Sequence, residues 1–189
     1  TIHIYTLNIM ITKNDLQNLY EWAKDKDFPV RKTPTTSGLY KKPYGTNKIH
    51  SYCNKEIFSF PLKFGRRKQT IRESLMPTKI ANIFKNDDIL YTVVSIFQSG
   101  TILKPHRDPH IYKFPYKRIQ IPLEIPEVGK CTMKWLKGGE IVWEEGVFQV
   151  CNVMYDVHEA SNLSDKDMVM MFIDVKMDTV VELSHPSDN

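Results

Sequence analysis

The pattern of hydrophobic and polar residues divides the chain into a mixed front part and a back part rich in strands. From residue 89 onward, short apolar or alternating runs are separated by turn residues, chiefly glycine and proline. This spacing is typical of antiparallel sandwiches and barrels, and a jelly roll is the natural arrangement for eight strands. The predicted strands are residues 89–97, 101–106, 117–125, 131–136, 140–144, 147–153, 155–161 and 168–176.

The front part mixes strand and helix patterns. Residues 2–11 are predicted to form a strand. Residues 15–24 repeat apolar side chains at helical spacing, which predicts a helix capped by Thr12 or Asn14. The fold class expected from the whole pattern is therefore mainly β with flanking helices.

Two further segments of the front part carry local signals. Thr70 stands three residues before Glu73, which is the spacing of a capping box and predicts a helical stretch that restarts at Pro77. Residues 33–48 combine Thr, Ser, Gly, Pro and Lys, and this composition indicates a surface loop.

The length of 189 residues predicts one domain spanning residues 1–189. Within it, residues 1–88 are expected to pack on the core, residues 89–176 to form the jelly roll, and residues 177–189 to form a tail. Hydrophobic residues make up 41% of the chain and charged residues 25%, so a sizeable core can form and wholesale disorder is excluded.

Charge is distributed unevenly along the chain. Residues 1–80 hold 15 basic and 6 acidic groups, whereas residues 81–189 hold 11 and 16. A positive segment of this kind steers anions such as acidic peptides, nucleic acid or phosphorylated metabolites, although it also suits a solvated surface that keeps a protein soluble.

The cysteines and the hydropathy pattern bear on location. Cys53, Cys131 and Cys151 are odd in number and widely spaced, which favours reduced thiols and a cytoplasmic protein. No uncharged apolar run approaches the roughly 18 residues of a membrane span, so a soluble chain without a membrane span is expected.

The stretch His106-Arg107-Asp108 is the sharpest chemical feature. On an extended strand, His106 and Asp108 point to the same side with α-carbons roughly 6 to 7 Å apart. His158, about 50 residues later in another predicted strand, is the best candidate for a third ligand. Two histidines and one carboxylate form the facial triad of non-haem Fe(II) oxygenases, with positions left open for cosubstrate and O2. His110 shares the parity of His106 and is the rival ligand.

Arg118 is the candidate partner for a cosubstrate dicarboxylate. The far carboxylate of 2-oxoglutarate needs a cation inside the barrel, and the guanidinium fork suits a carboxylate. Alternation places Arg118, Gln120 and Pro122 on one face of the strand and the neighbouring aliphatic residues on the other. An inward arginine would be a costly buried charge without an anionic partner, whereas a surface arginine is the alternative.

Five sequence pieces together resemble the aspartyl/asparaginyl β-hydroxylase family of Fe(II)- and 2-oxoglutarate-dependent oxygenases. The resemblance runs from about Tyr91 to Val175, and the order and spacing of the pieces match together. They are G-T-I-L-K-P-H-R-D at 100–108, K-R-I-Q-I-P-L at 117–123, G-G-E-I-V-W-E-E-G at 138–146, H-E-A-S-N at 158–162 and M-F-I-D-V at 171–175.

The resemblance implies a cupin-like double-stranded β-helix with helices packed outside it. It also implies that His106, Asp108 and His158 bind iron and that Arg118 holds a carboxylate of 2-oxoglutarate. The family typically has an arginine shortly before the I-D-V-like segment. This chain has Lys166 nearby instead, and a lysine supplies a point charge without the fork.

The implied activity is hydroxylation of a substrate C–H bond, with O2 consumed and 2-oxoglutarate converted to succinate and CO2. An amino-acid side chain in a protein, a peptide or a free amino acid is the expected target, and an acyl chain is the other substrate that the resemblance allows. The basic front half and the loop at 33–48 favour an anionic partner.

Two other classes of function stay open. One is a non-catalytic jelly-roll binding protein, which the altered cosubstrate contacts favour. The other is a nucleic-acid-modifying oxygenase. Enzymes of that class commonly have two arginines downstream of the distal histidine, and no arginine follows Arg118 here, so a nucleic-acid partner is not expected.

Overall fold

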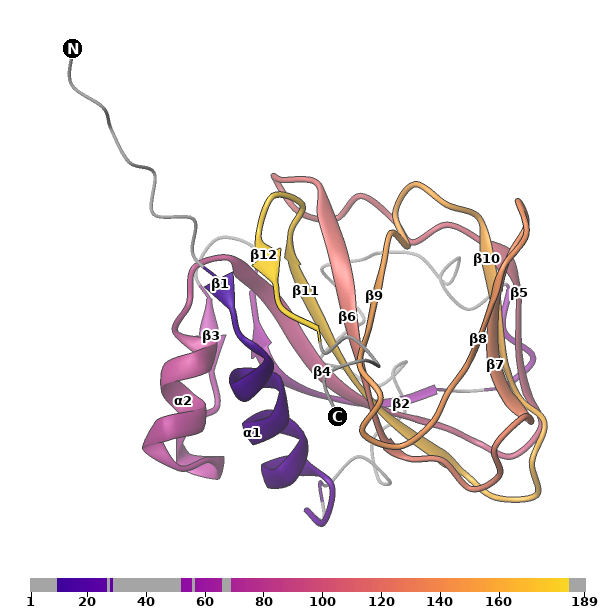
Figure 1. Ribbon diagram of the computed structural model, residues 1–189, viewed down its shortest axis with the longest axis horizontal. Helices are drawn as coiled ribbons and strands as arrows, with labels where there is room; N and C mark the ends of the chain where they lie inside the picture. Colours follow the sequence, from indigo (N-terminus) through magenta and orange to yellow (C-terminus); the bar gives the residue numbers. More distant parts are fainter. Residues whose placement is uncertain (1–9, 27, 29–51, 56, 66–68, 184–189) are drawn as a thin grey trace.

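The computed structural model places two antiparallel sheets face to face, with two helices on the outside (Figure 1). The structure describes residues 10–26, 28, 52–55, 57–65 and 69–183. The predicted loop at 33–48 and most of the predicted strand at 2–11 lie outside the described residues.

The larger sheet has the strand order β3-β2-β4-β11-β6-β9, and the smaller has the order β5-β10-β7-β8. The larger sheet contains β2 (Ile57–Phe64), β3 (Thr70–Ile71), β4 (Ile89–Phe97), β6 (Tyr116–Glu124), β9 (Gln149–Cys151) and β11 (Met168–Lys176). The smaller contains β5 (Thr101–His106), β7 (Cys131–Trp135), β8 (Glu140–Val142) and β10 (His158–Asn162). The predicted mainly β fold with flanking helices and a jelly-roll core is thereby confirmed.

The larger sheet buries both of its faces, which explains the nearly continuous apolar sequences of its central strands. Phe97, Met170 and Phe172 pack between the sheets. Ile121 and Ile173 belong instead to the cluster under the helices. Each such side chain contributes about 1.5 to 3 kcal/mol when fully buried, so the two clusters together fix the sheet in the middle of the molecule.

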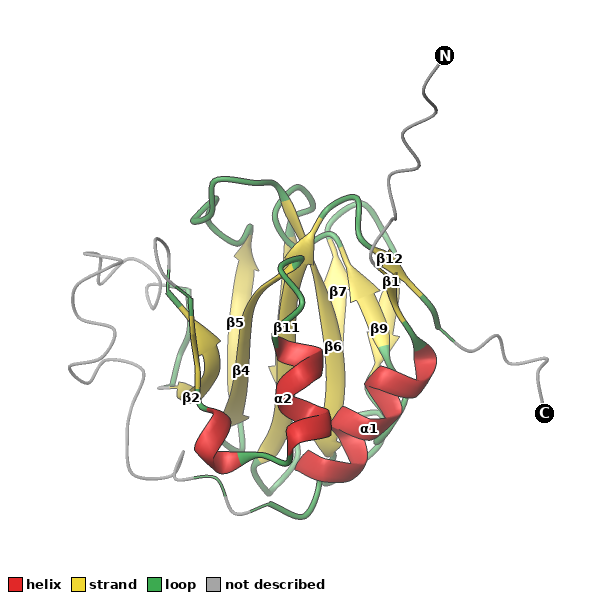
Figure 2. Ribbon diagram, turned by 90° about the vertical axis from the view of Figure 1, so that its left-hand side faces the viewer, coloured by secondary structure: helices red, strands yellow, loops and turns green. Residues whose placement is uncertain are grey.

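Two helices cover the outer face of the larger sheet (Figure 2). They are α1 (Lys13–Ala23) and α2 (Thr78–Phe84), and they bury Leu16, Leu19 and Phe84 against the sheet. No helix in the described ranges has the length and apolar character needed to cross a membrane.

A short parallel pair joins the two ends of the described chain. In this pair β1 (Met10–Ile11) lies beside β12 (Val180–Val181). The region after residue 176, which was predicted to be a tail, therefore contributes one strand.

Several predicted boundaries need correction. Thr70 lies in β3, and the 3-10 helix at Glu73–Leu75 has no side-chain cap, so the capping box predicted there does not form. The strand predicted at 155–161 begins only at His158, because residues 153–155 form a turn. The larger sheet already includes β2, so strand pairing begins well before residue 89, although the single-domain prediction itself stays a prediction.

Thr12, and not Asn14, caps α1. The Asp15 amide donates to the Thr12 hydroxyl at 3.1 Å, and the Thr12 amide donates to the Asp15 carboxylate at 3.0 Å. Both partners of this reciprocal pair satisfy amide groups that the first helical turn would otherwise leave unpaired.

We predict that Thr12→Ala lowers the free energy of unfolding by about 1 kcal/mol, because it removes the cap. Asn14→Ala is the matched control, since Asn14 is exposed within the first turn, and its effect should stay within about 0.5 kcal/mol. Urea denaturation measures both. Equal losses in the two variants would contradict the capping assignment.

Candidate metal centre

Two neighbouring strands of the smaller sheet bring the predicted histidines together. The last residue of β5, His106, is the register partner of His158, the first residue of β10. Directly opposed residues in an antiparallel pair have neighbouring side chains on one face of the sheet. The two imidazole rings lie with their centroids 4.4 Å apart.

Main-chain carbonyls orient both imidazoles. Because a carbonyl can only accept a hydrogen bond, Nδ1 of His106 donates to the Lys104 oxygen at 2.7 Å. Nδ1 of His158 likewise donates to the Asp156 oxygen at 3.0 Å. In the neutral rings Nε2 then carries the free lone pair, which is the form that binds metal.

Asp108 completes the cluster. Its Oδ1 lies 3.4 Å from Nε2 of His106 and 3.7 Å from Nε2 of His158. Ligand atoms of a shared ion lie about 3 to 4 Å apart when each bond is about 2.1 Å long. The three ligand atoms fall within 4.8 Å of one another. These three residues fit one metal ion, and two histidines with one carboxylate suit iron.

The electrostatics of the cluster favour the metal-binding forms. Burial opposes the charge on Asp108, but the Arg118 guanidinium and the two histidines outweigh it and lower the pKa of Asp108 to about 2. Burial lowers the pKa of His158, against the pull of the Asp156 carbonyl and the Asp108 carboxylate. At neutral pH the site therefore combines a carboxylate with a neutral His158 imidazole.

Arg118 faces the interior, which is one of the two placements that the alternation of its strand left open. Its neighbours Ile119 and Ile121 belong to the cluster under the helices. Its Nη1 donates to Oδ2 of Asp108, while Nε and Nη2 donate to the two oxygens of Asp174 at 2.6 and 3.1 Å. The structure thus places Arg118 beside the predicted triad, already paired with two carboxylates.

Lys166 lies away from this cluster. It is exposed in the loop after Asn162, the last residue of β10, whereas His158 is the first. At roughly 3.3 Å per residue, the four steps from His158 to Asn162 separate the two ends of the strand by about 13 Å. The hydrogen bonds of Lys166 are made by its main chain: the carbonyl accepts from the Asn162 amide at 2.8 Å and from the Ser164 hydroxyl at 2.9 Å, and the amide donates to the same hydroxyl at 3.4 Å. This placement does not support the predicted contact between Lys166 and a cosubstrate.

Three residues beside the cluster escaped the sequence reasoning. The Tyr52 ring stacks on His106 with centroids 3.9 Å apart, and burial raises the pKa of its hydroxyl. Asp174 pairs with Arg118, and the Tyr112 hydroxyl donates to Asp174 at 2.9 Å. A signal for Asp174 was present in the sequence, because Met170, Phe172 and Asp174 alternate on one face of β11.

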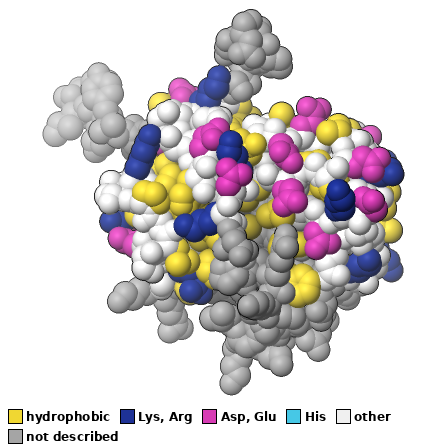
Figure 3. Space-filling model, turned by 90° about the horizontal axis from the view of Figure 1, so that it is seen from below, with side chains coloured by type: hydrophobic (Ala, Val, Ile, Leu, Met, Phe, Trp, Pro, Cys, Tyr) yellow, Lys and Arg dark blue, Asp and Glu magenta, His cyan; other side chains and the backbone are white. Residues whose placement is uncertain are grey.

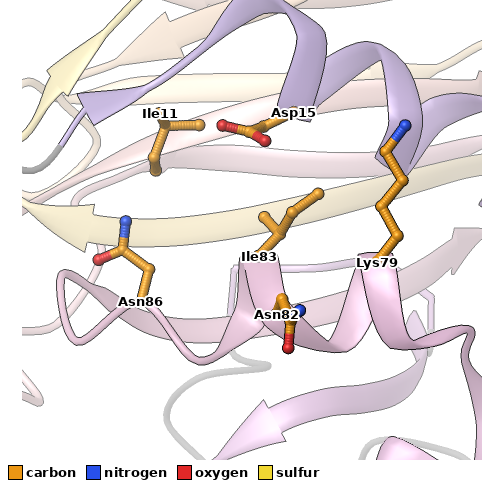
Figure 4. A pocket seen from close by; sticks show the side chains of 6 residues that line it. All are labelled: Ile11, Asp15, Lys79, Asn82, Ile83 and Asn86. Atoms are coloured by element: carbon orange, nitrogen blue, oxygen red, sulfur yellow. The ribbon is translucent and has the colours of Figure 1, made fainter.

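A groove between α1 and α2 is separate from this cluster (Figure 4). It has a volume of about 320 Å³ and lies outside the larger sheet. Its lining residues are Ile11, Asp15, Lys79, Asn82, Ile83 and Asn86. The only carboxylate among them already belongs to the cap of α1, so the groove offers no set of metal ligands.

The sequence matches one protein family over residues 58–177, and its description is aspartyl/asparaginyl β-hydroxylase. The match includes the whole triad together with Arg118 and Asp174. The chain belongs to this family. A search of curated proteins finds no match.

Two solved structures with a similar fold illustrate how distant such relatives can be. An oxidoreductase of the 2OG-Fe(II) oxygenase family from Burkholderia pseudomallei is 10% identical, with a TM-score of 0.47, and the match covers 67% of this chain and 71% of that one. A cupin-like protein from Thermotoga maritima is 14% identical, with a TM-score of 0.42, and the match covers 70% and 76%. Likenesses at this level add nothing to the site.

We predict that His158→Ala weakens Co(II) binding about 100-fold or more, because it removes one of three ligands. Mutation of a group that only contacts a ligand, outside the coordination sphere, commonly weakens metal binding about 10- to 100-fold. Anaerobic calorimetry with Co(II), a stable substitute for Fe(II), measures the affinity. His110→Ala is the matched control: His110 is exposed four residues beyond His106 and should leave the affinity unchanged. A loss in the control equal to that in His158→Ala would refute this ligand set.

Proposed function

We propose that this protein is an Fe(II)- and 2-oxoglutarate-dependent oxygenase that hydroxylates a C–H bond of an amino-acid side chain. The observation that carries the proposal is the convergence of His106, Asp108 and His158 within 4.8 Å in a chain of the hydroxylase family. When bound, iron and 2-oxoglutarate would supply the activation of O2 and the electrons for hydroxylation, with release of succinate and CO2.

The protein's own residues prepare the site for that chemistry. The carbonyls of Lys104 and Asp156 hold both imidazoles with Nε2 toward Asp108. The three ligand side chains are only 6 to 10% exposed, and Tyr52 covers one face of His106. Such enclosure limits the access of water and strengthens electrostatic interactions within the site.

Arg118 can still contact a cosubstrate. Three of its five N–H groups donate to Asp108 and Asp174, and the other two have no partner among the residues that the structure describes. We assign these two donors to a carboxylate of 2-oxoglutarate. Because Lys166 is remote, Arg118 is the cation among the described residues that would bind this carboxylate.

Exposed basic residues close to Asp108 in sequence support an anionic substrate. Arg107 and Lys113 are exposed in the loop between β5 and β6, which also holds Asp108. Basic groups at the entrance of a site attract anions and raise their local concentration. We therefore favour a target residue within an acidic peptide or protein segment.

The face of the molecule seen in Figure 3 gives no support to a nucleic-acid substrate. On the face seen in Figure 3, acidic and basic side chains of the described residues are intermingled. Nucleic-acid binding relies on a clustered positive surface.

The decisive experiment incubates the protein with Fe(II), ascorbate and 2-oxoglutarate and quantifies succinate, with and without acidic peptides. We expect succinate at least tenfold above that formed by His106→Ala, and we expect acidic peptides to increase it. The His106→Ala protein is the control because it lacks one of the three proposed metal ligands.

Metal binding without succinate formation would favour the alternative function, a non-catalytic jelly-roll binding protein. The pairing of Arg118 with Asp174 supports this alternative, because it leaves the guanidinium only partly available to a cosubstrate.

A further inference from the structure

The two oxygens of Asp108 have different partners. Oδ1 faces the two imidazoles, at 3.4 and 3.7 Å from their Nε2 atoms. Oδ2 accepts a hydrogen bond from Nη1 of Arg118. A carboxylate with one oxygen held in this way can present the other to a metal in one orientation, because rotation about the side-chain bond would break the charged hydrogen bond.

Arg118 is itself held from the opposite side. It is the register partner of Asp174 on the neighbouring strand β11. Both oxygens of Asp174 accept from the guanidinium, and the Phe172 ring lies 5.3 Å beneath it. This paired contact fixes the plane of the fork as well as its position.

Tyr112 fixes the far end of the chain of contacts. Its hydroxyl donates to Oδ2 of Asp174 at 2.9 Å. Asp174 is fully buried, and among the described residues its side chain is hydrogen-bonded to Arg118 and Tyr112. A buried carboxylate is costly unless it is paired, and pairing two carboxylates with one guanidinium prevents that guanidinium from swinging away.

We propose that Tyr112, Asp174 and Arg118 form a positioning chain that orients the metal-binding oxygen of Asp108. Arg118 then acts on the metal through Asp108, in addition to any contact with a cosubstrate. Asp174 and Tyr112 serve this chain and touch neither metal nor substrate. The inference rests on the proposed function only in requiring that the triad binds a metal.

The test measures Co(II) binding in the absence of any 2-oxo acid. A residue that serves only the cosubstrate cannot affect this measurement. We expect Arg118→Lys, which keeps the charge but loses the fork, and Asp174→Asn to weaken Co(II) binding about tenfold or more. Tyr112→Phe should weaken it about threefold, because only one distant hydrogen bond is lost.

The visible absorption spectrum of bound Co(II) provides a second readout. It reports the geometry around the metal, so a variant that is merely less stable would leave the spectrum of the bound form unchanged, whereas a displaced Asp108 would shift it. Tyr116→Phe is the matched control, because the Tyr116 ring packs against the Tyr112 ring. The Tyr116 hydroxyl donates to the Pro109 carbonyl at 3.2 Å and does not contact Asp174. It should change neither the affinity by more than twofold nor the spectrum.

The outcomes separate this inference from the proposed function. If Arg118→Lys and Asp174→Asn bind Co(II) with unchanged affinity and spectrum and lose only 2-oxoglutarate binding, the positioning chain is refuted and the oxygenase proposal stands. If the variants change Co(II) binding but the unmodified protein forms no succinate, the positioning chain stands and the oxygenase proposal fails. Should Asp174→Asn fail to fold by circular dichroism, Tyr112→Phe decides the question, and an unchanged spectrum in that variant refutes the inference.

Discussion

The pairing of β5 with β10 is the constraint on which the candidate site depends. Because side chains alternate faces along a strand, a slip of one residue would turn His158 away from His106. β10 is protected against such a slip, since it pairs with β5 on one side and with β7 on the other. At its far end, Asn162 donates to the carbonyls of Phe97 and Lys166 and thereby links the strand to neighbouring segments.

The charged side chains inside the barrel do not balance one another. Asp108 and Asp174 are acidic, and Arg118 is the cation that both contact. Together these three side chains carry one excess negative charge. A divalent cation bound at the proposed site would reverse that sign, and the interior would then attract an anionic ligand.

The sequence was sufficient where local patterns decide structure. The strands at 89–97, 101–106 and 168–176 have the predicted bounds, because apolar runs there end at turn residues. The clustering of His106, Asp108 and His158 could be predicted, because histidine and aspartate two positions apart on a strand share a face and His158 lies in another predicted strand about 50 residues later.

The rest depends on contacts between distant segments. β2 was missed because Pro61 and Lys63 interrupt its pattern, and strand interiors normally exclude proline. Pro61 lies outside the part of β2 that pairs with β3, and the pairing of β2 with β4 shifts register between Pro61 and Lys63. No local signal connects Tyr52 with His106. The role of Asp174 becomes visible only when the register sets it opposite Arg118.

The parallel pairing of β1 with β12 has a consequence for how the molecule is made. Met10 meets Val180 across almost the full length of the described chain. During synthesis on the ribosome, β1 cannot find its partner until residues 180 and 181 have emerged. Contacts so distant in sequence slow folding, because the chain between them must be ordered first. This small sheet is therefore expected to close late, and nascent chains stalled before β12 would retain an unpaired β1 edge.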